Sequence, residues 1–176
     1  MKRYIVIILL LISGSVVHAQ MLGLKTNLLK DAACTPNIAL DVALGGHISL
    51  STELFGSYNI YGTKFKTFGV APEVRYWYEG RCYKGFFLGI GAKAIHYDYT
   101  WKKERRRGDA GGVGVTFGYD FFFRDHFAID VHAGLGAMAH WQSHYSEDNP
   151  RNLSYRERGL SIVPYQLGVS FIYIIK

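Results

Sequence analysis

From residue 21 onward, apolar and polar side chains alternate along the chain with a period of two, which is the period of a β-strand. Interruptions in this pattern divide it into eight predicted strands. They cover residues 21–28, 37–45, 47–57, 66–78, 84–98, 110–122, 127–142 and 160–175. Their lengths are close to or above the roughly 9–11 residues that a tilted strand needs to cross the hydrocarbon of a bilayer.

The connections between these strands alternate between short and long. Short turns are expected near residues 45–46, 79–81 and 124–125, and longer polar links near 29–36, 58–64, 102–108 and 143–158. Short periplasmic turns and longer outer loops are typical of barrels in the bacterial outer membrane. The expected fold is therefore all-β, an eight-stranded antiparallel up-and-down transmembrane barrel with both ends of the chain in the periplasm.

The two faces of each predicted strand differ in composition. In the last strand Tyr165, Leu167 and Val169 share one face, and Gln166 and Ser170 share the other. A soluble barrel such as a lipocalin could be built from the same alternation with its apolar face inward. The polar face here is rich in glycine and in charges of both signs, as a narrow lumen requires, and the apolar face carries bulky aromatic residues. We therefore expect the apolar face to contact lipid.

The first residues have the features of a secretory signal. Lys2 and Arg3 precede an apolar run over residues 4–17, and small residues follow at the usual cleavage positions. The run is shorter than the roughly 20 residues of a spanning helix. We expect a cleaved signal peptide at residues 1–19 and a single barrel domain at residues 20–176, located in the bacterial outer membrane.

Composition and charge agree with this interpretation. The 13 Tyr, 11 Phe and 20 Gly favour strands with aromatic bands over helices. The formal charge of +6 points to an anionic membrane surface, because an exported chain rarely meets nucleic acid. Cys34 falls in an outer loop and Cys82 in an inner turn, whereas the Cα atoms of a disulfide lie within about 7 Å. We expect no disulfide between them.

Strand parity directs a mixed set of ionisable residues into the lumen. The set is Lys25, Asp41, Glu53, Glu73, Arg75, Lys93, Asp120, Asp130 and His132. Rings of charge can form a gated ion path, so a small channel is one alternative. Eight strands, however, leave an interior just wide enough for side chains. We expect a structural network, because buried charges must be paired and hydrogen-bonded.

A basic run lies in the third long link. It comprises Lys102, Lys103, Arg105, Arg106 and Arg107. Such a run is either a solvated loop or a contact for the phosphates of lipopolysaccharide through charge-assisted pairs. The expected partners are outer-membrane lipid, lipopolysaccharide and a further exported protein, with no nucleic acid. No cofactor is expected, and the histidines lack the spacing of metal ligands.

One segment hints at catalysis. His144 and Ser146, with Glu157 eleven positions after the serine, are similar to the His-x-Ser and later Glu of the outer-membrane lipid A deacylases. In those enzymes serine attacks an ester, histidine accepts its proton and glutamate orients the imidazole. Glu147 stands where they carry asparagine, and a carboxylate there would oppose an oxyanion. Strand parity also points His144 and Ser146 into the lumen. A lipid A ester hydrolase is therefore the alternative, and no catalytic residue is assigned.

Several blocks resemble one known family. They are residues 24–29 (LKTNLL), 31–32 (DA), 35–37 (TPN), 72–77 (PEVRYW), 85–89 (GFFLG) and 168–173 (GVSFIY). Together they resemble domain of unknown function 3575 (DUF3575), a family of small exported barrel proteins. Lys30 departs from an expected aromatic residue, and Gln166 departs from an expected lysine. The resemblance implies an architecture and a location without an activity. We expect a non-enzymatic outer-membrane barrel that serves envelope structure or surface interaction through its loops.

Overall fold

The computed structural model describes residues 21–58, 65–101, 104–124, 126–146 and 149–175. Residues 1–19, the predicted signal peptide, lie outside this part of the chain. The elements are β1 (Met21–Asn27), α2 (Leu28–Ala32), β2 (Asn37–Ala43), β3 (Ile48–Tyr58), β4 (Phe65–Trp77), β5 (Gly85–Trp101), β6 (Glu104–Arg124), β7 (Phe127–Ser146) and β8 (Asn149–Ile175).

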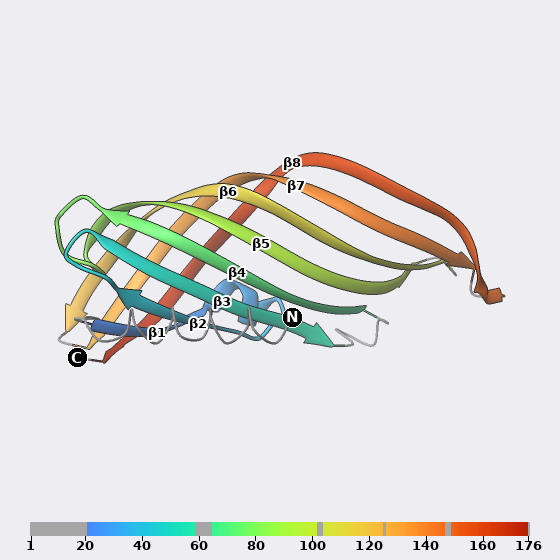
Figure 1. Cartoon of the computed structure of the whole chain (residues 1–176). Coiled ribbons are helices and arrows are strands. Elements are labelled where there is room, and N and C mark those ends of the chain that lie inside the picture. Colours follow the sequence, from blue (N-terminus) through green and yellow to red (C-terminus); the bar gives the residue numbers. More distant parts are fainter. Residues whose placement is uncertain (1–20, 59–64, 102–103, 125, 147–148, 176) are drawn as a thin grey trace, which may run out of the picture.

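The strands form one closed antiparallel barrel in which each strand pairs with the next along the chain (Figure 1). β1 closes it by pairing with β8, from Leu22 opposite Ile175 to Asn27 opposite Ser170. The predicted eight-stranded up-and-down barrel is confirmed. We call the end with the β2–β3, β4–β5 and β6–β7 turns the inner end, and the opposite end the outer end. Among the described residues, no helix is long and apolar enough to cross a membrane.

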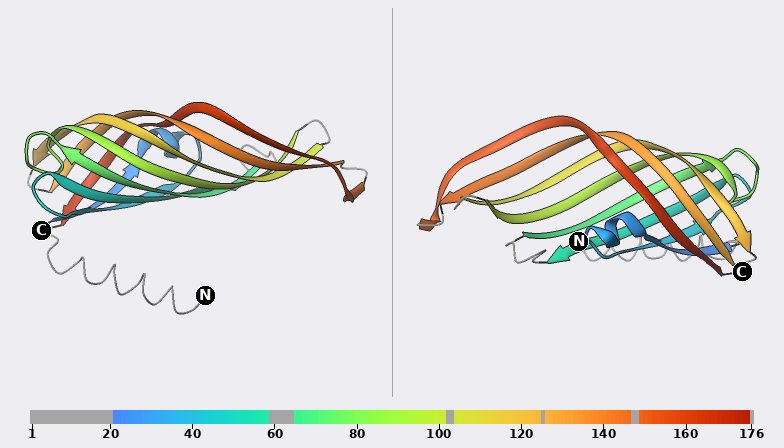
Figure 2. Two further views of the ribbon diagram at one scale, coloured as in Figure 1. Left: turned by 45° about the horizontal axis from the view of Figure 1, so that its top comes forward. Right: turned by 180° about the vertical axis from the view of Figure 1, so that it is seen from behind.

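The barrel wall is much taller on one side than on the other. β1 and β2 have 7 residues each, whereas β6, β7 and β8 have 21, 20 and 27. At the outer end the hairpins of β5 to β8 reach beyond β1 to β3, and β7 and β8 reach farthest (Figure 2). The long loops predicted at 102–108 and 143–158 were therefore wrong, since strand pairing continues to Trp101 opposite Glu104 and to Ser146 opposite Asn149. Backbone hydrogen bonds hold such hairpins together even where the side chains are all polar.

Side chains divide sharply between the two faces of the wall. Large apolar residues such as Ile90, Leu135 and Leu167 point outward and are more than half exposed. Glycines, small polar residues and ionisable groups point inward and are buried. At the inner end the interior becomes apolar, with a core of Ala43, Trp77, Cys82, Tyr83, Phe87, Ala128, Ile172 and Ile174.

The predicted outward position of Tyr165 was wrong. The register moves from Gly134 opposite Gln166 to Leu135 opposite Pro164, so Tyr165 is the extra residue of a β-bulge. Tyr165 and Gln166 consequently both face the lumen and are buried. Side chains on the outer part of β8 then follow the opposite parity, and Leu160 and Ile162 become the outward residues.

Candidate functional site

An aromatic floor closes the inner end of the lumen. The β4–β5 turn folds inward, and Tyr83, with a φ of 64°, donates a hydrogen bond of 2.9 Å to the carbonyl oxygen of Asp41. The Trp77 ring lies 5.0 Å from the Phe87 ring, and its indole N–H donates to Ser49 Oγ at 3.1 Å. Burial beneath this floor raises the pKa of the Cys82 thiol to about 12. The inner end is thus sealed by packed rings.

Directly above the floor, Arg75 joins carboxylates from two sides of the barrel. Its Nε donates to Glu73 Oε1 at 2.9 Å on the same strand, and its Nη1 donates to Asp130 Oδ2 at 2.8 Å on β7. The guanidinium carbon stacks 4.3 Å from the centre of the Phe87 ring. Thr116 on β6 donates a further hydrogen bond to Glu73 at 2.5 Å. One cation therefore links β4 to β7 across the lumen.

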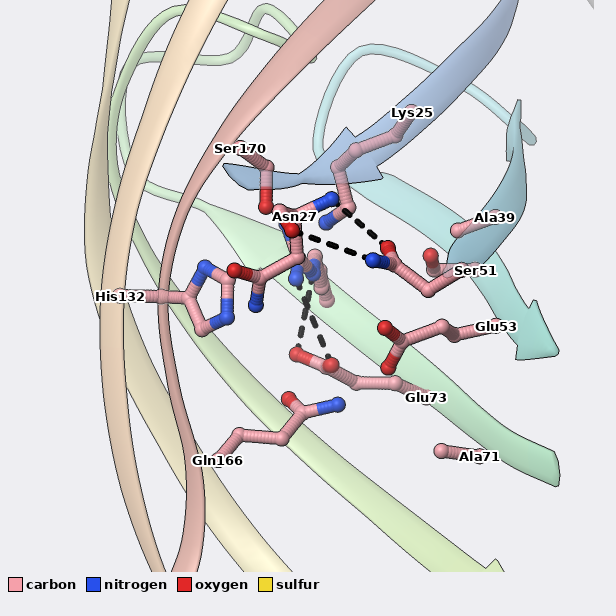
Figure 3. Close-up of a pocket in the computed structure, with 12 residues that line it drawn as sticks. Lys25, Asn27, Ala39, Ser51, Glu53, Ala71, Glu73, His132, Gln166 and Ser170 are labelled. Carbon is pink, nitrogen blue, oxygen red and sulfur yellow. Dashed lines mark hydrogen bonds and ion pairs between the residues drawn. The ribbon is translucent and has the colours of Figure 1, made fainter. Parts of the chain in front are cut away.

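Asp130 is the centre of this network. Besides Arg75, it accepts a hydrogen bond from Lys25 Nζ at 2.8 Å and lies 2.8 Å from Nδ1 of His132. All four side chains are buried. Figure 3 shows Lys25, Glu73 and His132 converging from separate strands on the same internal space. Asp130 therefore connects β1, β4 and its own strand through charge-assisted bonds.

Two other buried carboxylates lack such partners. Neither oxygen of Asp41 or of Asp120 has a hydrogen-bond partner among the described residues, although both side chains are fully buried. Asp120 also lies directly opposite Asp130 in the β6–β7 pairing, which places two carboxylates side by side on the inward face. Burying an ionisable group without a hydrogen bond is unfavourable, so these two residues are weak points of the lumen.

A second set of polar contacts closes the outer part of the lumen. Lys30 on α2 donates to both oxygens of Glu53 at 2.6 Å, and its Nζ lies 4.7 Å from the centre of the Phe55 ring. Lys93 donates to the carbonyl oxygen of Tyr165 and lies over the same tyrosine ring. Lys30 was not among the predicted lumen residues, because it was assigned to an outer loop. The sequence did contain one sign of this position, because Lys30 stands where the family resemblance leads one to expect an aromatic residue. A lysine at that place needs an acidic partner.

The chain matches one family model, described as "Protein of unknown function (DUF3575)", over residues 5–175. The protein belongs to the DUF3575 family. No curated protein and no solved structure matches the chain. The family thus supplies no activity, and any role of this DUF3575 barrel must be argued from its own residues.

The segment that resembled the family most specifically builds a clamp around α2. Asn27 caps the helix by accepting from the backbone N–H groups of Leu29 and Lys30. The Asn37 side chain accepts a hydrogen bond of 2.7 Å from the backbone N–H of Asn27 and donates one of 3.1 Å to its carbonyl oxygen. Asp31 accepts from Thr26 at 2.7 Å and from Asn37 at 2.9 Å. This clamp turns the chain back at the low rim and holds Lys30 over Glu53.

Among the described residues, the lumen beside the Asp130 network contains little free space. The cavity between the Asp130 network and the α2 clamp has a volume of about 10 Å³. Its lining includes Lys25, Asn27, Glu53, His132 and Gln166 (Figure 3). A site of this size holds about one water molecule. This cavity therefore has no room for a small-molecule substrate.

The structure places all nine predicted lumen residues on the inward face, and it brings three of them, Lys25, Arg75 and His132, into contact with Asp130. The basic run is only partly visible: Lys102 and Lys103 lie outside the described residues. Arg105 and Arg106 lie on β6, and Arg107 on the same strand is exposed.

The segment that hinted at catalysis lies on the tall outer hairpin. His144 and Ser146 belong to β7 and Glu157 to β8, where Glu157 pairs with Gln142 and His144 with Tyr155. The side chains of the three residues are outside the described part of the structure. The hydrolase alternative stays a prediction.

Proposed function

We propose that this DUF3575 protein is an exported, non-enzymatic barrel of the bacterial outer membrane that supports the envelope and presents an interaction surface on its tall outer wall. One observation carries the proposal: the polarity of the barrel is inverted. Charged groups are buried inside, and bulky apolar side chains cover the outside. Exposing so many large apolar residues to water would be costly, whereas lipid accommodates them.

The distribution of aromatic residues supports a membrane location. Near the inner end, aromatic rings contact one another on the outward face, including Tyr76 with Tyr78, Tyr78 with Phe86, and Phe127 with Tyr173. Trp141 lies exposed toward the other end. Aromatic girdles at two levels around an apolar band are typical of barrels in outer membranes.

The filled lumen favours a structural role over transport. Floor, charge network and clamp occupy successive levels, and the cavity between them holds about one water molecule. A conducting path would require the Arg75 and Lys25 pairs to separate, which would leave charges buried without partners. We therefore propose that the network stabilises the barrel and does not conduct ions.

The tall hairpins of β5 to β8 supply the proposed interaction surface. They carry Arg105, Arg106 and the exposed Arg107, with Lys102 and Lys103 between β5 and β6 in the sequence. Basic residues at this end can bind the phosphate groups of lipopolysaccharide through charge-assisted hydrogen bonds. They can bind the carboxylates of an acidic segment in another exported protein in the same way. Neutralising the five residues together should weaken retention of lipopolysaccharide and leave folding intact, whereas unchanged retention would remove this part of the proposal.

Localisation and conductance test the proposal. The native chain should fractionate with outer membranes and run at a different position on gels when unheated, because closed barrels resist detergent unfolding. Purified protein in planar bilayers should give no stepwise conductance. Recovery as a soluble periplasmic protein would contradict the membrane assignment, and regular single-channel steps would contradict the structural role of the lumen.

A further inference from the structure

The outward face changes character over three successive rows of paired residues near the outer end. The row nearest the inner end is apolar, and its residues are large on β2 to β4 and small on β5 to β7: Ile38, Leu54, Val70, Ala94, Gly111 and Ala139. The next row is mixed: Gly56, Phe68, His96, Asp109 and Trp141. The outermost row is polar over β3 to β6: Tyr58, Lys66, Asp98 and Arg107. This order matches the depth profile of a lipid, from acyl chain through linkage to headgroup.

Phe68 stands between two grooves in this surface. On one side, a groove of about 390 Å³ is lined by Pro36, Ile38, Leu54 and Gly56 among others. Gly56 pairs with Phe68 and contributes no side chain, so the groove opens beside the ring.

On the other side of Phe68, a groove of about 230 Å³ runs over Gly69 and Ala94 toward His96 and Asp109. The two grooves are open on their outer side, and Phe68 is the wall that they share.

Basic side chains lie at the outer end of the two grooves. Lys66 lies two residues from Phe68 on the same strand and face, is exposed, and sits 4.4 Å over the Tyr58 ring. Arg107 is exposed two strands away in the same row, roughly 10 Å from Lys66 by the spacing of strands, with Asp98 between them. Asp109, at the end of the smaller groove, lies 2.7 Å from Nδ1 of His96. An anionic headgroup above these grooves would therefore meet Lys66 and Arg107, with the Asp98 carboxylate between them.

We infer that the Phe68 grooves and Lys66 form a binding site for lipid A, the phosphorylated multi-chain lipid of the outer leaflet. The inference rests on the proposed outer-membrane location, in which the outer end of the barrel faces that leaflet. Two acyl chains lie in the grooves on either side of Phe68, and a phosphate accepts hydrogen bonds from Lys66. The wall is lowest at the neighbouring β1 and β2, whose 7 residues are fewer than the roughly 9–11 of a spanning strand, so lipid must adapt to the protein here.

The variants that test this site have close matches on the same strands. Ala94→Leu fills the smaller groove. Its control is Ala92→Leu, which adds the same side chain to the same face of β5 but outside the groove. Ile38→Trp fills the larger groove, with Leu40→Trp as its match on β2. Lys66→Gln removes the headgroup cation, and Lys84→Gln removes an exposed lysine at the inner end. The unheated gel shift identifies the variants that fold.

Native mass spectrometry of the detergent-solubilised chain should measure binding of bisphosphorylated lipid A, dephosphorylated lipid A and phosphatidylglycerol. Wild type should retain lipid A best, and each groove variant should bind it at least several-fold more weakly than its matched control. Loss of a charge-assisted bond in Lys66→Gln should weaken binding about tenfold for the phosphorylated form only.

Equal binding by Ala94→Leu and Ala92→Leu would overturn the groove assignment. Equal retention of phosphatidylglycerol and lipid A would overturn the choice of lipid. Either result in a chain that still fractionates with the outer membrane would refute this site alone, whereas a soluble chain would refute the proposed function.

Discussion

Replacing Asp130 should destabilise the barrel far more than replacing Asp41, although both are fully buried aspartates on the inward face. Asp130 accepts hydrogen bonds from Lys25 and Arg75 and contacts His132, each at 2.8 Å. Neither oxygen of Asp41 has a hydrogen-bond partner among the described residues. The comparison therefore separates the effect of broken charge pairs from the effect of changing a buried carboxylate.

The expected magnitudes follow from these contacts. Asp130→Asn keeps the shape of the side chain but removes the negative charge that two buried cations share, leaving Lys25 without its ion-pair partner. Breaking a buried pair from one side costs about 3–5 kcal/mol. In Asp41→Asn an unpartnered amide replaces an unpartnered carboxyl, and because both pay a similar desolvation cost, the free energy of unfolding should change by about 1 kcal/mol or less.

Reversible urea unfolding of the chain in lipid vesicles, followed by tryptophan fluorescence, measures both changes. The slope of the free energy against urea should be the same for wild type and variants, so that the midpoints report stability. Equal losses for Asp130→Asn and Asp41→Asn would refute the reasoning, because burial rather than pairing would then decide the cost. A loss below about 1 kcal/mol for Asp130→Asn would refute the importance of the network itself.

Three further predictions concern the wall, the lumen and the inner turn. Val115→Arg, on the outward face near mid-strand, should cost about 2–4 kcal/mol in vesicle unfolding if lipid surrounds it, and no loss would contradict the membrane assignment. Gly114→Ala should lower the unfolding midpoint markedly, since its methyl would lie 2.4 Å from a lumen tyrosine ring, whereas Gly111→Ala on the same strand meets nothing closer than 3.7 Å and should be tolerated. Burial raises the pKa of Cys82 to about 12, so at pH 8 it remains a thiol. A maleimide at pH 8 should therefore label the exposed Cys34 quickly and Cys82 only after denaturation, without any reductant. Rapid native labelling of Cys82 would contradict its burial.

The fold was predictable because a period of two repeats over most of the chain. Each strand of a barrel has one face inside and one outside, so parity alone assigns residues such as Lys25, Arg75 and Asp130 to a common interior. The partners within that interior were not predictable. Asp120 and Asp130 carry the same side chain, lie opposite each other in the β6–β7 pairing and both face the lumen. Among the described residues, however, only Asp130 forms hydrogen bonds with the buried cations. That difference depends on where side chains from distant strands end, which no local pattern records.

Two departures from the predicted wall have local causes. A single bulged residue at Tyr165 reverses the parity of the outer part of β8. Alternation alone does not reveal it, because residues 162–164, which precede the bulge, are all apolar. The helix α2 went unrecognised because its 5 residues are too few for a helical period. Its cap, Asn27, was visible in the sequence, but Asn is equally common in turns. The sequence pattern therefore places Lys30 in a loop, although its Nζ bonds to Glu53 over the lumen.

The position of the charge network explains why a sealed barrel contains so many ionisable groups. The seam between β1 and β8 is short, because the two strands pair only from Leu22 to Asn27 on the β1 side. Lys25 lies within this seam, and its bond to Asp130 ties β1 to β7 behind β8. Asp130 is in turn held by Arg75 on β4, so the network fastens the seam to the opposite wall. Charged side chains that hold the β1–β8 seam closed do not imply an ion path through the lumen. Because Lys25 on β1 would lose its partner, replacement of Asp130 should increase amide hydrogen exchange first in β1.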